Sequence, residues 1–150
     1  MKKTLLVILF FLLAVPDALG GEGISIQDPW VRQNPPGTSA TAAYMVIENR
    51  SAAGDELVDV SCECSSRASL HLTQTSGDSM VMRKVNSIAI PAGGKATLSP
   101  GGHHVMLEGL SGEMSKSVVL ELEFRSGKHM RVKAPVVSPR DTEVHDHHHH

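Results

Sequence analysis

Short runs in which apolar and polar residues alternate recur along most of the chain, and none keeps a helical period. Such runs predict β-strands, because successive side chains of a strand point to opposite faces. Turn-forming residues separate the runs, as at Asn34–Gly37, Pro91–Gly94 and Pro100–Gly102. The predicted strands are Ile24–Val31, Thr41–Glu48, Glu56–Cys62, Arg67–Thr73, Ser79–Val85, Ser87–Ile90, Lys95–Leu98, His104–Leu107, Lys116–Phe124 and Lys128–Ala134. We therefore expect an all-β fold, a sandwich or a barrel.

The clearest alternation puts Leu120, Leu122 and Phe124 on one face of a strand. Glu121 and Glu123 lie between them and point to the other face. This strand is expected to have one face in the core and one in water.

The beginning of the chain breaks this pattern. Met1–Lys3 is basic, Thr4–Val15 is almost wholly apolar, and small residues follow at Ala18 and Gly20. These are the three parts of a secretory signal peptide, and the apolar run is shorter than the roughly 20 residues of a transmembrane helix. We expect residues 1–20 to be a cleaved signal peptide, and residues 21–137 to form one domain in the periplasm. No cysteine follows the predicted cleavage site at once, so a lipid anchor is not indicated.

The end of the chain is polar from residue 138 to residue 150, and this segment is predicted to be a disordered tail. Its histidines are either a purification tag or a native metal-binding tract. They are His145, His147, His148, His149 and His150. The acidic context around Asp146 favours a native tract, which would form a second, speculative site and gather copper(II).

Charge excludes some classes of partner. The net charge is −2 and both signs are interspersed, so neither nucleic acid nor a membrane surface is an expected partner. After signal cleavage we expect no membrane insertion, and we expect a monomer. The composition instead points to metal, because seven methionines and nine histidines stand against one tryptophan, one tyrosine and three phenylalanines. Thioether and imidazole are ligands for soft or borderline metals.

One strand predicted above presents two such ligands together. His104 and Met106 are two residues apart and share a face, whereas His103 points to the other face. His103 is therefore a weaker candidate ligand.

Two further predicted strands supply the remaining candidates. Met80 and Met82 share a face, and periodicity does not choose between them. His71 is flanked by Leu70 and Leu72, so it faces outward if the leucines are core. Four residues therefore stand out as the predicted site, His71, Met82, His104 and Met106, and Met80 remains an alternative to Met82.

Two neutral imidazoles and two thioethers form a soft donor set that suits copper(I). Zinc is less well served, because its structural sites draw on thiolates, histidines and carboxylates. The alternative is that the methionines fill gaps in the core and the histidines are surface groups.

Four stretches resemble the periplasmic copper chaperone family known as PCuAC: Leu70–His71, Gly77–Arg83, Ile90–Gly94 and Pro100–Leu107. The family signature is a His, ten residues, a Met, twenty-one residues and His-x-Met, and the four predicted ligands reproduce it. Met80 falls outside that register. The similarity extends over residues 24–137.

The resemblance implies a cupredoxin-like Greek-key β-sandwich and a solvent-accessible copper(I) site. It also implies that Pro100–Gly102 turns His104 and Met106 toward the other ligands. The expected partner is the copper-accepting subunit of cytochrome c oxidase, whose dinuclear copper centre would receive the ion, or another copper chaperone.

Cys62 and Cys64 are not part of the signature. Three interpretations remain: a disulfide across one residue, a second copper(I) site or redox aid, and a pair without function.

Two other functions compete with the chaperone. An electron-transfer cupredoxin needs a Cys thiolate beside two histidines, which the His-x-Met loop does not offer. A metal-independent module that binds or assembles other proteins rests on fold class alone. An enzyme is not expected, because no Ser-His-Asp arrangement, phosphate loop or metalloprotease motif is present.

Overall fold

The computed structural model describes residues 23–138, which form ten strands and no helix. The predicted signal peptide and the histidines of the predicted tail lie outside these residues. Within the described part of the chain, nothing qualifies as a membrane-spanning helix. The strands are β1 (Ile24–Arg32), β2 (Ala40–Asn49), β3 (Asp55–Cys62), β4 (Ser65–Ser76), β5 (Ser79–Lys84), β6 (Ile88–Ile90), β7 (Lys95–Leu98), β8 (His103–Leu110), β9 (Ser117–Phe124) and β10 (His129–Val137).

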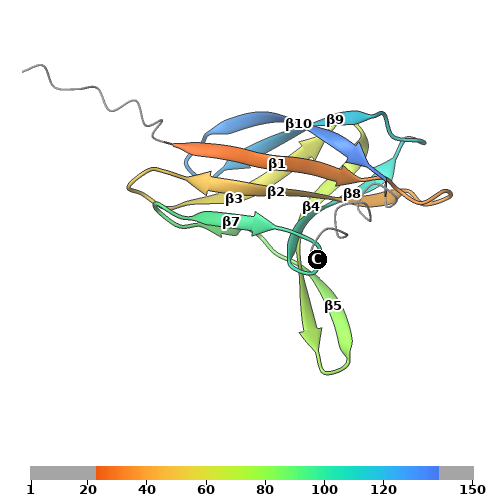
Figure 1. The fold of residues 1–150 in the computed structure, drawn as a ribbon, viewed down its shortest axis with the longest axis horizontal. Coiled ribbons are helices and arrows are strands. Elements are labelled where there is room, and N and C mark those ends of the chain that lie inside the picture. The colour runs from red at the N-terminus through yellow and green to blue at the C-terminus, as the bar shows by residue number, and fades with distance from the viewer. Residues whose placement is uncertain (1–22, 139–150) are drawn as a thin grey trace, which may run out of the picture.

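The strands form one continuous sheet in the order β5-β4-β8-β7-β2-β1-β10-β9-β3-β6. The sheet folds over where β1 and β10 run parallel, with Val31 opposite Val136 (Figure 1). The two halves are the layers of a β-sandwich, and the chain crosses between them repeatedly. The all-β prediction is confirmed.

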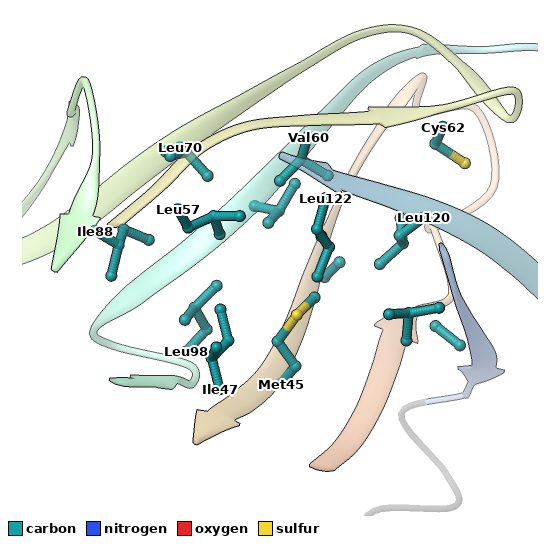
Figure 2. Close-up of a cluster of buried hydrophobic side chains, with 14 of the residues drawn as sticks. Met45, Ile47, Leu57, Val60, Cys62, Leu70, Ile88, Leu98, Leu120 and Leu122 are labelled. Carbon is teal, nitrogen blue, oxygen red and sulfur yellow. The ribbon is translucent and has the colours of Figure 1, made fainter. Parts of the chain in front are cut away.

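The core lies between the layers. Leu120, Leu122 and Phe124 are all buried, as the alternation predicted. Met45 from β2 and Leu70 from β4 belong to the same cluster (Figure 2). Burying each such side chain stabilises the fold by about 1.5–3 kcal/mol.

The hairpin of β4 and β5 projects beyond the sandwich (Figure 1). Every residue of β5 is exposed, and so is the end of β4 from Gln74 to Ser76. The sequence-based boundary at Thr73 was therefore too early, because both faces of this hairpin meet water and no apolar alternation marks it. The predicted end of the next strand at Val85 was one residue too late.

A short loop joins β7 to β8, the strand that carries His104. Met45–Glu48 of β2 pairs with β7, and Ala40–Ala43 pairs with β8, so the two strands follow one another along β2. The loop between them turns at Gly101, whose φ of 85° favours glycine. His104 follows shortly after this turn.

Candidate metal centre

The pairing of β4 with β8 brings two histidines and a methionine together. His71 lies directly opposite His104, and Ser69 lies opposite Met106. Directly opposite residues share a face of the sheet, and the two imidazole centroids are 5.8 Å apart. Leu70 points the other way, into the core.

The pairing of β4 with β5 adds Met82 to the same face. Met82 lies opposite Thr73, two residues beyond His71, and so is a diagonal neighbour of that histidine. Met80 lies opposite Thr75, one pair farther from His71. The register therefore places Met82 closer to the histidines than Met80, which periodicity alone did not distinguish.

His104 is fixed by the loop that precedes it. Its Nδ1 lies 3.0 Å from the carbonyl oxygen of Gly102, an arrangement in which Nδ1–H donates. The same oxygen accepts the backbone N–H of Thr73 at 3.1 Å, which ties the loop to β4. In this tautomer Nε2 of His104 carries the free lone pair. Nε2 is buried and has no hydrogen-bond partner.

His71 has a similar arrangement with the ring nitrogens exchanged. Its Nε2 lies 2.9 Å from the hydroxyl of Ser69, whereas its Nδ1 is buried and has no partner. When Nε2–H donates to the hydroxyl, Nδ1 carries the lone pair. A buried polar atom without a partner costs free energy, so two such atoms on one face indicate a site for a ligand.

The surroundings of His71 favour its neutral imidazole by lowering its pKa. Burial lowers the pKa of His71, and His104 and Lys84 lower it further, while Glu108 acts in the opposite direction. Glu108 itself is paired with Arg67 at 2.9 Å. A neutral imidazole is the form that binds a metal.

An aromatic wall encloses the site on the side of β2. The rings of Tyr44 and His104 have centroids 6.4 Å apart, and Trp30 packs on Tyr44 at 4.5 Å. The guanidinium of Arg32 lies 5.8 Å from the centre of the Tyr44 ring. Sequence reasoning did not assign this wall, although Trp30 and Tyr44 are the single tryptophan and the single tyrosine of the chain.

The site is closed at one end and open at the other. His104 is only 3% exposed, whereas Met82 is 50% exposed and Met80 is 68% exposed. Solvent therefore reaches Met82 on the side of the hairpin and scarcely reaches His104.

Three of the weaker candidates do not reach this site. His103 is opposite Leu72, on the other face of the sheet from His104, so the structure does not bring it to the other ligands. Cys62 and Cys64 form a disulfide at the turn before β4. Seven positions separate Cys64 from His71, which is about 20 Å along an extended strand. The structure therefore does not make the two cysteines part of the predicted centre.

The predicted copper(II) tract consists of five histidines. Every one of them follows residue 138, the last residue that the structure describes. His145, His147, His148, His149 and His150 all lie outside the described residues. Their role as a copper(II) tract stays a prediction.

No group of three or more His, Cys, Asp or Glu among residues 23–138 is arranged to hold a metal ion. Two surface hollows, one beside Gln33–Thr38 and one beside Gly54–Glu56, contain neither histidine nor methionine. The candidate centre is thus a patch on a sheet face.

Comparisons with known proteins bear on the family and the fold of the chain. The family model described as LpqE-like matches residues 24–136. A protein of Leifsonia xyli subsp. xyli (strain CTCB07), named as a lipoprotein, is 30% identical over 118 residues, which are 77% of this chain and 70% of the relative. The copper-bound PCuAC domain from PmoF2 is similar over 77% of this chain and 93% of its own, with a TM-score of 0.66 and 24% identity. The solution structure of CuI-DR1885 from Deinococcus radiodurans is similar over 81% and 80%, with a TM-score of 0.60 and 32% identity. The fold is that of PCuAC domains, the cupredoxin-like sandwich that the sequence predicted.

Proposed function

The chain belongs to the LpqE-like family, and from this membership and its PCuAC fold we propose that it is an exported copper(I) chaperone. It binds one copper(I) through His71, Met82, His104 and Met106. It then delivers the ion to the dinuclear copper centre of cytochrome c oxidase or to another chaperone. It acts by binding and transfer and not as an enzyme.

The observation that carries this proposal is the pair of partnerless ring nitrogens. Nδ1 of His71 and Nε2 of His104 belong to directly opposite residues on one sheet face. Met106 extends from the same strand as His104, and Met82 lies on the same face of the hairpin. The donors are uncharged and soft, which favours copper(I) over zinc.

The difference in exposure supports a role in transfer. The buried imidazole of His104 holds the ion on the side of the sandwich, whereas the thioether of Met82 meets solvent on the hairpin. An acceptor ligand reaches the ion first from the exposed side. Exchange then begins at Met82 and ends at His104, so the ion is never free in solution.

The tail extends the proposal. The imidazoles of its five histidines, at position 145 and at positions 147–150, would bind divalent copper weakly and collect it for the domain. Removing the chain after Val137 is expected to reduce copper(II) uptake and to leave copper(I) affinity unchanged. Unchanged copper(II) uptake would remove the tail from the mechanism.

An electron-transfer role finds no support in the arrangement of the sulfurs. A blue-copper centre requires a thiolate beside two histidines. Cys62 and Cys64 are bound to each other, and about 20 Å of extended chain separates Cys64 from His71.

Competition for copper(I) against a coloured chelator tests the proposal. The purified protein is expected to take one copper(I), and the His104→Ala/Met106→Ala variant is expected to lose this binding. Met82→Leu and Met80→Leu form a matched pair, because both remove a thioether from β5 and keep a side chain of similar size. Only Met82→Leu is expected to weaken copper(I) binding.

Equal copper(I) binding by the wild type and by the His104→Ala/Met106→Ala variant would reject the site, and would favour a metal-independent module. Binding without transfer to the reduced, copper-free soluble domain of the oxidase subunit would keep the site and reject that acceptor.

A further inference from the structure

The disulfide of Cys62 and Cys64 is a second chemical feature that the copper site does not use. Cys62 ends β3, and Cys64 lies in the turn before β4. Cys62 is 8% exposed and sits at one end of the core cluster, whereas Cys64 is half-buried (Figure 2). The turn lies at the opposite end of β4 from the projecting hairpin (Figure 1).

This disulfide is poorly placed to act as a structural cross-link. The stabilisation that a cross-link gives through chain entropy grows with the length of the loop it closes. Here the bond spans a single residue, Glu63. In addition, β3 is held by β9 and β6, and β4 is held by β8 and β5, without help from the bond.

The two sulfurs differ in a way that suits thiol–disulfide exchange. Cys64 is the more accessible of the two residues. The backbone N–H of Cys64 points at Sγ of Cys62, at 3.1 Å. If the bond breaks at Cys64, the electron pair leaves on Cys62, where this N–H stabilises the thiolate. Disulfides that are accessible are the reducible ones in proteins.

We propose that Cys62 and Cys64 form a thiol–disulfide exchange site that oxidises a cysteine pair of a client protein. A client thiolate attacks Sγ of Cys64, the bond between the two protein sulfurs breaks, and Cys62 leaves as the thiolate. The second client thiolate then attacks the client sulfur of the mixed disulfide and releases Cys64. The client loses two electrons and two protons and gains a disulfide, and the protein ends with two thiols.

This site is independent of the proposed copper site, because about 20 Å of strand separates Cys64 from His71. Loss of either activity therefore leaves the other unchanged. The His104→Ala/Met106→Ala variant provides this control.

The test uses a short reduced peptide with two cysteines, in the absence of oxygen and with metal chelated, since copper itself oxidises thiols. Alkylation and mass spectrometry count the thiols on both molecules. The wild type and the His104→Ala/Met106→Ala variant are expected to gain two thiols for each peptide oxidised. The Cys62→Ser/Cys64→Ser variant is expected to leave the peptide reduced.

The single variants test the assignment of the attacked sulfur. With the oxidised peptide, Cys62→Ser keeps the accessible Cys64 thiol and is expected to form a mixed disulfide. Cys64→Ser keeps only the buried Cys62 thiol and is expected to react much more slowly. A wild-type disulfide that stays closed at every excess of reduced peptide overturns the proposal, and equal reaction of the two single variants overturns the assignment to Cys64.

Discussion

The hydroxyl of Ser69 is expected to raise the copper(I) affinity of the proposed site. It does so by holding the ring of His71, and it does not contact the ion itself. Ser69 is 2.9 Å from Nε2 of His71, and both side chains lie on the outer face of β4. When Nε2–H donates to this hydroxyl, the hydrogen bond holds the ring and leaves the lone pair on Nδ1, the buried nitrogen without a partner. Ser69→Ala removes this orientation and leaves the imidazole in place.

The size of the expected loss in copper(I) affinity follows from the known effect of hydrogen bonds to metal-binding histidines. Removing a hydrogen-bond partner of a ligating histidine typically costs roughly 10- to 100-fold in metal affinity, or about 1.4–2.7 kcal/mol. Competition between the protein and a copper(I) chelator measures this change directly. The matched control is Ser61→Ala, because Ser61 is an exposed serine of β3, remote from both histidines. It is expected to bind copper(I) like the wild type.

Two results would refute the reasoning. Unchanged affinity in Ser69→Ala, together with a large loss in His71→Ala, would mean that the hydroxyl does not orient the ring. An increase in affinity would mean that Nε2 of His71 is the ligating atom and that the hydroxyl competes with the ion.

Other predictions concern protonation and packing. Because the pKa of His71 is lowered from 6.5 in the folded protein, the unfolded chain takes up a proton first as the pH falls. The free energy of unfolding of the metal-free protein should therefore fall below about pH 6.5, until the pH passes the folded-state pKa. Urea titrations at several pH values measure this fall. The His71→Asn variant should lack the part of the fall that comes from this histidine. Phe124→Ala removes a fully buried ring and is expected to cost about 3–5 kcal/mol in urea unfolding, whereas Val119→Ala, at an exposed position of the same strand, should cost under about 1 kcal/mol. A similar cost for both would mean that the face of β9 that bears Phe124 is not the core.

The strands were predictable because alternation records which face of a strand is buried. Leu120 and Leu122 show this, and the same rule placed His104 and Met106 on one face. The sequence alone did not show which strands pair with one another in the sheet. That His71 meets His104 depends on the register of β4 against β8, and register is a property of two segments far apart in the chain.

The hydrogen-bonding groups that hold the histidines were missed for a related reason, although the turn at Pro100–Gly102 was expected. Ser69 and Gly102 act through a hydroxyl and a backbone carbonyl, and neither group has a distinctive pattern in the sequence. Tyr44 reaches His104 from the neighbouring strand β2. The hairpin boundary was missed because β5 projects into solvent on both faces, where no core imposes a period.

The division of the donors between the sandwich and the hairpin has a consequence for how such proteins diversify. His71, His104 and Met106 lie on strands whose reverse faces build the core, so packing of the core fixes the positions of their backbones. No residue of β5 is buried, and this strand can accumulate substitutions by drift without loss of the fold. Under the proposed transfer, substitutions in β5 would change the exposed side of the site, and with it the acceptor that the site fits, while His71 and His104 stay the same.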